Sequence, residues 1–143
     1  MKRALFVALL GLIAIALGCG PGGGAEGTAK KLLEATKTGD ADTLADHIDW
    51  KGMYESIPEE YRGDKTVEDF EKEARAEMKK HTDEANEEFE YEILSCEEEG
   101  DTATLKVKTK ENKDADWEER TIILKKIDGK WVITMEGLQD MGD

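Results

Sequence analysis

Side chains that could act as a general acid or base are few in this chain of 143 residues. The candidates are the two histidines, one aspartate and the three tyrosines: His47, Asp49, Tyr54, Tyr61, His81 and Tyr91. Such a group must lie within hydrogen-bonding reach of the proton that it moves, and a nucleophile needs a base beside it. None of the six stands in a spacing that defines such a pair. The sequence therefore predicts no catalytic residue.

Cysteine chemistry is a second possibility, since the chain contains two cysteines, Cys19 and Cys96. Cys96 lies in the strand-like stretch 92–96, where a cysteine commonly serves as a small buried apolar side chain. A nucleophilic role needs a nearby base, and the sequence places neither histidine there. If Cys19 is modified, Cys96 has no partner for an intramolecular disulfide. The fold is then expected to rest on packing.

Metal binding is a third possibility, because oxygen-bearing side chains alternate in one loop: Asn112, Asp114, Asp116 and Glu118. A calcium loop needs a glycine at its sixth position and an acid at its twelfth. This chain has Trp117 and Ile123 at those positions. The pattern predicts a solvated hairpin loop, and no metal or other cofactor is expected.

The N-terminus has the composition of an export signal. Lys2 and Arg3 precede an uninterrupted apolar run over residues 4–17, which ends at Gly18 and Cys19. A signal peptide consists of a basic start, an apolar run and a small residue at the cleavage site. The run is shorter than the roughly 20 residues that cross a bilayer as a helix. A cleaved signal is therefore favoured over a permanent membrane span.

Residues 16–19, Ala-Leu-Gly-Cys, resemble the bacterial lipobox. The resemblance implies that residues 1–18 are removed as a signal peptide and that Cys19 receives a thioether-linked diacyl group and an amino-terminal acyl chain such as palmitate. Several acyl chains hold a protein firmly on a membrane. Gly20 stands where an aspartate would favour the inner membrane, so the outer membrane is favoured in a source that has one. The alternative is an ordinary secretory signal with Cys19 as an incidental thiol.

The mature chain divides into a tether and one domain. Residues 19–27 hold the lipidated Cys19 and a glycine-rich segment that behaves as a flexible linker. Residues 28–143 suffice for one compact domain. The formal charge of −14, or about −16 once Lys2 and Arg3 are removed, repels phosphate backbones. Nucleic acid is excluded as a partner, and contact with the membrane is expected through the lipid.

Helical spacing governs the first half of the domain. Apolar residues recur at steps of three and four over 28–38, 41–48 and 66–87, which predicts three helices. Residues 49–58 are expected to form a loop with about one helical turn. Gly39 is expected to end the first helix, and Asp40 or Asp42 to cap the second.

Alternation with a period of two governs the second half. It predicts four antiparallel strands over residues 88–98, 102–110, 117–127 and 130–136. A two-residue turn at 128–129 would pair Leu124 with Ile133 and Ile122 with Met135. The apolar alternation changes parity within the first strand, which predicts a β-bulge. An α+β domain results, with about three helices packed in the concavity of a curved four-stranded meander.

The hairpin that ends at residues 38–40, the third helix and a meander that closes on residues 128–133 resemble the nuclear-transport-factor-2-like (cystatin-like) superfamily, especially its uncharacterised bacterial lipoproteins. The resemblance covers residues 28–136 and implies a cone-shaped fold with a concave cavity. Such cavities commonly take apolar ligands. The side chains expected to bound it, unless they close the core instead, are Leu33, Trp50, Tyr54, Phe70, Leu105 and Trp131.

These features predict a membrane-tethered lipoprotein of the cell envelope with a small non-catalytic domain that binds an apolar ligand or an envelope protein. Two alternatives remain: an isomerase-like or dehydratase-like enzyme that uses the cone pocket, as in the superfamily, and a passive structural component of the envelope. The superfamily also forms sheet-to-sheet dimers. The face of the meander that is expected to be exposed would serve such a homodimer or would simply be solvated. It carries Ile123, Ile127 and Val132 among Thr121, Lys125 and Thr134.

Overall fold

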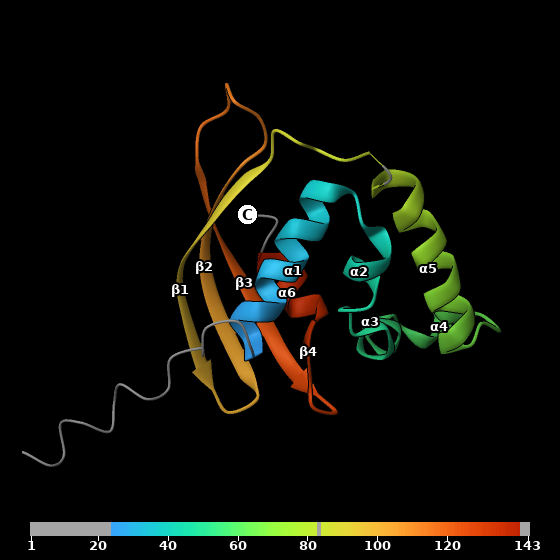
Figure 1. Cartoon of the computed structure of the whole chain (residues 1–143). Helices are drawn as coiled ribbons and strands as arrows, with labels where there is room; N and C mark the ends of the chain where they lie inside the picture. The colour runs from blue at the N-terminus through green and yellow to red at the C-terminus, as the bar shows by residue number, and fades with distance from the viewer. Residues whose placement is uncertain (1–23, 83, 141–143) are drawn as a thin grey trace, which may run out of the picture.

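The computed structural model describes residues 24–82 and 84–140 (Figure 1). Five helices come first, a four-stranded sheet follows and a short helix comes last, so the predicted α+β class is confirmed. The elements are α1 (Gly24–Thr38), α2 (Ala41–Ala45), α3 (Trp50–Ser56), α4 (Glu59–Arg62), α5 (Val67–Thr82), β1 (Glu90–Glu99), β2 (Thr102–Lys110), β3 (Glu118–Ile127), β4 (Lys130–Ile133) and α6 (Met135–Asp140).

The sheet is an antiparallel meander in the order β1-β2-β3-β4. Leu124 lies opposite Ile133, which confirms the register predicted from the turn at 128–129. The pairing of β1 with β2 shifts between Ile93 and Ser95, so the predicted bulge is present. Its extra residue is Leu94, whose side chain is turned out to solvent.

The predicted end of the last strand is wrong, because β4 stops at Ile133 and Met135 starts α6. The Thr134 hydroxyl accepts a hydrogen bond from the Gly137 N–H at 3.4 Å, which is the geometry of a helix N-cap. Gly137 then lies so close to β3 that a Cβ on it would be 2.5 Å from the Ile123 carbonyl oxygen. The cap and the glycine let a helix pack where a longer strand was expected.

This helix changes the face expected to form a dimer. Val132 and Thr134 are buried within the protomer, and Lys125 forms an ion pair of 2.8 Å with Glu136 of α6. Ile127 remains 39% exposed. The prediction that Val132 and Thr134 face solvent is wrong, and the homodimer stays a prediction.

The main core lies between α1 and the sheet (Figure 1). Its helix side consists of Ala25, Ala29, Leu32 and Leu33, and its sheet side includes Ala103, Leu105, Val107, Ile122, Leu124, Trp131 and Ile133. Because α1 begins at Gly24, residues 24–27 are helical and do not belong to a flexible linker. Glu98 of β1 accepts a hydrogen bond from the Ala25 N–H at 3.2 Å and so caps the helix from the sheet.

A smaller core joins α2, α3 and α5 on the side of α1 that faces away from the sheet (Figure 1). Ala45, Trp50 and Met53 are buried there, against Phe70, Ala74 and Met78 of α5. The residues expected to form the loop 49–58 include α3, capped by Asp49, whose side chain accepts from the Gly52 N–H at 3.0 Å. α5 ends at Thr82, five residues earlier than predicted.

Gly39 offers a test of how α1 meets the segment after α5. Its φ is +72°, and a Cβ would lie 2.8 Å from the Thr82 carbonyl oxygen and 3.0 Å from the Ala85 nitrogen. Gly39→Ala is expected to cost about 2–4 kcal/mol, since the left-handed backbone costs about 1–2 kcal/mol and backbone atoms block the methyl group. Urea unfolding measures the loss.

Gly129→Ala is the matched control, because Gly129 has φ +79° and open space around it. It should lose only the backbone contribution. Equal losses in the two variants would contradict the close approach at Gly39.

Candidate binding site

The six residues predicted to line one apolar pocket fall into two clusters. Leu33, Leu105 and Trp131 belong to the main core. Trp50 and Phe70 belong to the smaller core, and the Tyr54 ring lies 5.8 Å from the Phe70 ring, centroid to centroid. The structure does not bring the six into one lining. Their contacts are those of core residues, which was the alternative reading of the same side chains.

Three of the acid–base candidates hold the fold through hydrogen bonds or ion pairs. Asp49 caps α3. The Tyr54 hydroxyl donates to the Lys65 carbonyl oxygen at 2.5 Å, which ties α3 to the start of α5. His81 lies on the exposed side of α5, 3.2 Å from the Glu77 carboxylate. These contacts account for the three side chains without a catalytic role.

Two more candidates also lack a catalytic partner within the described part of the chain. Nδ1 of His47 is 2.9 Å from the Thr43 carbonyl oxygen. A carbonyl only accepts, so Nδ1 carries the hydrogen. Tyr61 is 76% exposed. Neither arrangement pairs a base with a nucleophile.

The sixth candidate, Tyr91, lines a surface depression of about 480 Å³ where α1 ends beside β1. We call this the Tyr91 depression, and its lining is Glu34, Lys37, Phe89, Glu90, Tyr91, Glu92 and Trp117. The Tyr91 hydroxyl donates to the Glu34 carboxylate at 3.3 Å, and the Phe89 and Tyr91 ring centroids are 6.2 Å apart. Aromatic rings and carboxylates therefore meet on one exposed surface.

A second depression of about 430 Å³ shares Glu34 with the first. It lies between α1 and α2, and its other lining residues are Lys31, Ala35, Thr38, Asp40, Thr43 and His47. The Asp40 carboxylate accepts from both the hydroxyl and the N–H of Thr43. These hydrogen bonds lower the pKa of Asp40 below its usual range. Its role is to cap α2.

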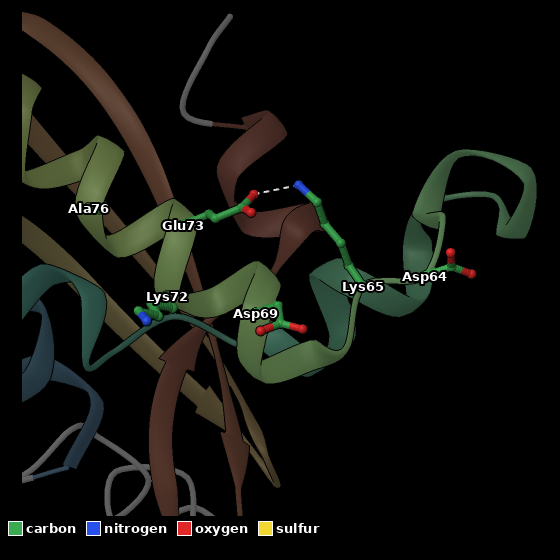
Figure 2. Close-up of a pocket in the computed structure, with 6 residues that line it drawn as sticks. All are labelled: Asp64, Lys65, Asp69, Lys72, Glu73 and Ala76. Atoms are coloured by element: carbon green, nitrogen blue, oxygen red, sulfur yellow. Dashed lines mark hydrogen bonds and ion pairs between the residues drawn. The ribbon is translucent and has the colours of Figure 1, made fainter.

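A third depression, of about 500 Å³, lies beside the start of α5 (Figure 2). Its lining is Asp64, Lys65, Asp69, Lys72, Glu73 and Ala76. Lys65 and Glu73 form an ion pair of 2.5 Å across it, as the dashed line in Figure 2 marks. No aromatic ring lines this depression. Ligand sites combine apolar surface with a few polar groups, so the Tyr91 depression is the better candidate.

The phenol of Tyr91 reports on this site. Burial raises the pKa of Tyr91, and the neighbouring Glu34 carboxylate raises it further. Because the folded pKa is above the unfolded value, the stability gained by keeping the phenol protonated is present below the unfolded pKa. It is lost as the pH rises through the folded pKa.

Tyrosine ultraviolet absorbance, followed with pH, tests this prediction. The phenol that ionises above the ordinary range should vanish in Tyr91→Phe and shift to lower pH in Glu34→Gln. It should persist in Tyr61→Phe, which serves as the control. Its persistence in Tyr91→Phe would contradict the assignment.

Cys96 packs against the main core from β1. It is assigned to a disulfide, whereas the sequence predicted that Cys96 has no disulfide partner if Cys19 is modified. Cys19 and the signal segment 1–18 lie outside the described residues, as do residues 20–23 of the expected linker.

Two further findings concern residues 24–82 and 84–140. Within these ranges, no group of three or more His, Cys, Asp or Glu side chains is arranged to hold a metal ion. None of the helices in the same ranges combines the length and the apolar composition needed to traverse a bilayer.

No model of a known protein family matches the chain, and no curated protein matches its sequence. Solved structures are similar in fold. The crystal structure of a Campylobacter jejuni protein, whose name proposes an NTF2-like transpeptidase, gives a TM-score of 0.52 at 16% identity and covers 79% of this chain and 99% of that chain. A variant of a protein named Rd1NTF2_05 gives a TM-score of 0.48 at 20% identity and covers 76% of this chain and 90% of that chain.

The chain therefore adopts the NTF2-like fold, in which helices precede a curved four-stranded antiparallel sheet. This is the fold that the sequence resemblance implied. At such low identity the similarity establishes the fold, and the function has to be argued from the residues of this chain.

Proposed function

We propose that this protein is a membrane-tethered binding domain of the bacterial cell envelope, which holds its ligand without changing it chemically. The observation that supports this best is the Tyr91 depression. It combines exposed aromatic surface with a carboxylate held by the Tyr91 hydroxyl, which is the mixture typical of ligand sites.

The tether is argued from the sequence of residues 1–27. A lipid on Cys19 would hold the domain at the membrane, on the outer membrane where the source has one. The acidic character of the chain, with a formal charge of −14, disfavours flat contact with anionic headgroups. The lipid would therefore be the main contact with the bilayer.

The sulfur chemistry sharpens this proposal. Cys19 is the one other cysteine in the sequence. An intrachain disulfide on Cys96 would therefore take the sulfur that a thioether-linked lipid needs. The two states of Cys19 exclude each other. The proposal requires the lipidated one, and the disulfide assigned to Cys96 argues against it.

An enzymatic role is the weaker proposal. The name of the Campylobacter jejuni protein suggests acyl transfer, which needs an activated nucleophile with a base beside it. In this chain both His47 and His81 have structural partners, and neither is paired with a nucleophile among the described residues. A passive structural role would account for Phe89 and Tyr91, which pack in and against the main core, but not for the exposed Trp117 ring.

Native mass spectrometry of the full chain, released gently from the membranes of its own source, tests the binding function. The expected result is a complex whose additional small mass is lost on denaturation, with the ligand recovered unaltered. A chain that carries neither a ligand nor a protein partner would overturn the proposal. Recovery of a chemically converted ligand would favour the enzyme.

A further inference from the structure

We infer that the Tyr91 depression binds an organic ammonium ion, that is, a small organic molecule with a positively charged nitrogen. The inference rests on the proposed binding function and adds the chemical class of the ligand. It replaces the simple apolar ligand that the sequence predicted for a different pocket.

The first argument is the aromatic lining. Phe89, Tyr91 and Trp117 all line the depression. The face of an aromatic ring attracts an ammonium group that lies within about 6 Å of its centroid. Trp117 is 44% exposed although indole is largely apolar, so a ring face is available at the surface. Phe89 is only 8% exposed and belongs to the main core, so Tyr91 and Trp117 are the rings that would contact a cation with apolar groups.

The second argument is charge. Three carboxylates line the depression, those of Glu34, Glu90 and Glu92. They face the ammonium of Lys37 in the lining and that of Lys108, which pairs with Glu92. Glu34 is held in place by the Tyr91 hydroxyl. An anionic ligand would meet like charge here. A neutral ligand could donate hydrogen bonds to the carboxylates, but only a cation would also gain from their charge. The net charge of the chain also raises the local concentration of cations.

The third argument is that a lysine ammonium of the protein already lies beside the Trp117 ring and the Glu92 carboxylate. The Lys108 ammonium lies 5.1 Å from the centroid of the Trp117 ring and 2.7 Å from the Glu92 carboxylate. It therefore makes both contacts that a ligand ammonium would make. Lys108 should compete with the ligand, and its removal should strengthen binding.

Choline is a suitable probe, and its uncharged carbon isostere, 3,3-dimethylbutan-1-ol, is the control for shape. Calorimetric titration of the full chain, in a detergent without an ammonium head group, is expected to give saturable binding of choline. The isostere should bind at least about tenfold more weakly, because it lacks the charge. Choline affinity should also fall with added salt.

Variants locate the site. Trp117→Leu and Glu34→Gln should each weaken choline binding about 3- to 10-fold, in line with the size of single cation–π and charge contacts. Glu97→Gln, an exposed change on the same strand outside the depression, should leave it unchanged. Lys108→Gln should strengthen binding about 2- to 5-fold, because the competing ammonium is gone.

Equal binding of choline and its isostere would overturn the inference, and so would weaker binding by Lys108→Gln. The binding function is judged separately, by native mass spectrometry. A recovered ligand without a cationic nitrogen would contradict the inference but would still support the binding function. If neither a ligand nor a protein partner is recovered, the proposed binding function is contradicted.

Discussion

Leu105→Ala is expected to lower the free energy of unfolding by about 2–5 kcal/mol, the usual cost of emptying a buried leucine site. Leu105 is 0% exposed and lies in the main core between α1 and the sheet. Its neighbours belong to a sheet and a helix that cannot readily close the space. Urea unfolding of the full chain, followed by circular dichroism, measures the loss.

The stability of the same variant shows whether Leu105 lies in a packed core or lines an open pocket. Leu105 was predicted from the sequence to line an open cavity, where truncation costs little because water or ligand already borders the side chain. Thr104→Ala is the control, since Thr104 is the next residue along β2 and is only half-buried. It should lose about 0.5 kcal/mol. Similar losses for both variants would contradict the core assignment.

Cys19→Ser is expected to move nearly all of the protein from the membrane fraction to the soluble fraction of its own source. The physical reason is that several acyl chains supply the attachment, and serine cannot form the thioether that carries two of them. Immunoblotting of fractionated cells measures the distribution.

Cys96→Ser is the matched control, because it removes the other cysteine of the chain and leaves the lipobox intact. This variant should stay with the membrane. If Cys19→Ser also stays there, the attachment is not made through Cys19. The uncleaved apolar segment over residues 4–17 would then be the remaining candidate for the attachment, although it is shorter than a helix that crosses a bilayer.

Much of the sheet could be predicted because its signals are local. A two-residue turn sets the register of both flanking strands, and Asp128 and Gly129 have φ values of 51° and 79°, as that turn requires. The parity change around Leu94 marked the bulge in the same way. Neither feature depends on residues far away in the sequence.

Most of the features that were missed depend on distant contacts. α1 could start at Gly24 because Glu98, 73 residues from Ala25, caps it. The Tyr91 depression exists because Tyr91 meets Glu34, 57 residues earlier. Apolar periodicity identified the large core side chains but could not divide them between two clusters. The N-cap at Thr134 is a local signal that strand alternation concealed.

The mass of the N-terminal peptide of the mature protein tests the central claim most directly, namely that a lipid on Cys19 tethers this NTF2-like domain. The protein is taken from membranes of its own source and digested without reduction. We expect a peptide that begins at Cys19 and carries a diacylglyceryl group and an acyl chain. A peptide in which Cys19 is joined to Cys96 by a disulfide, or one that begins at Met1, would contradict the account.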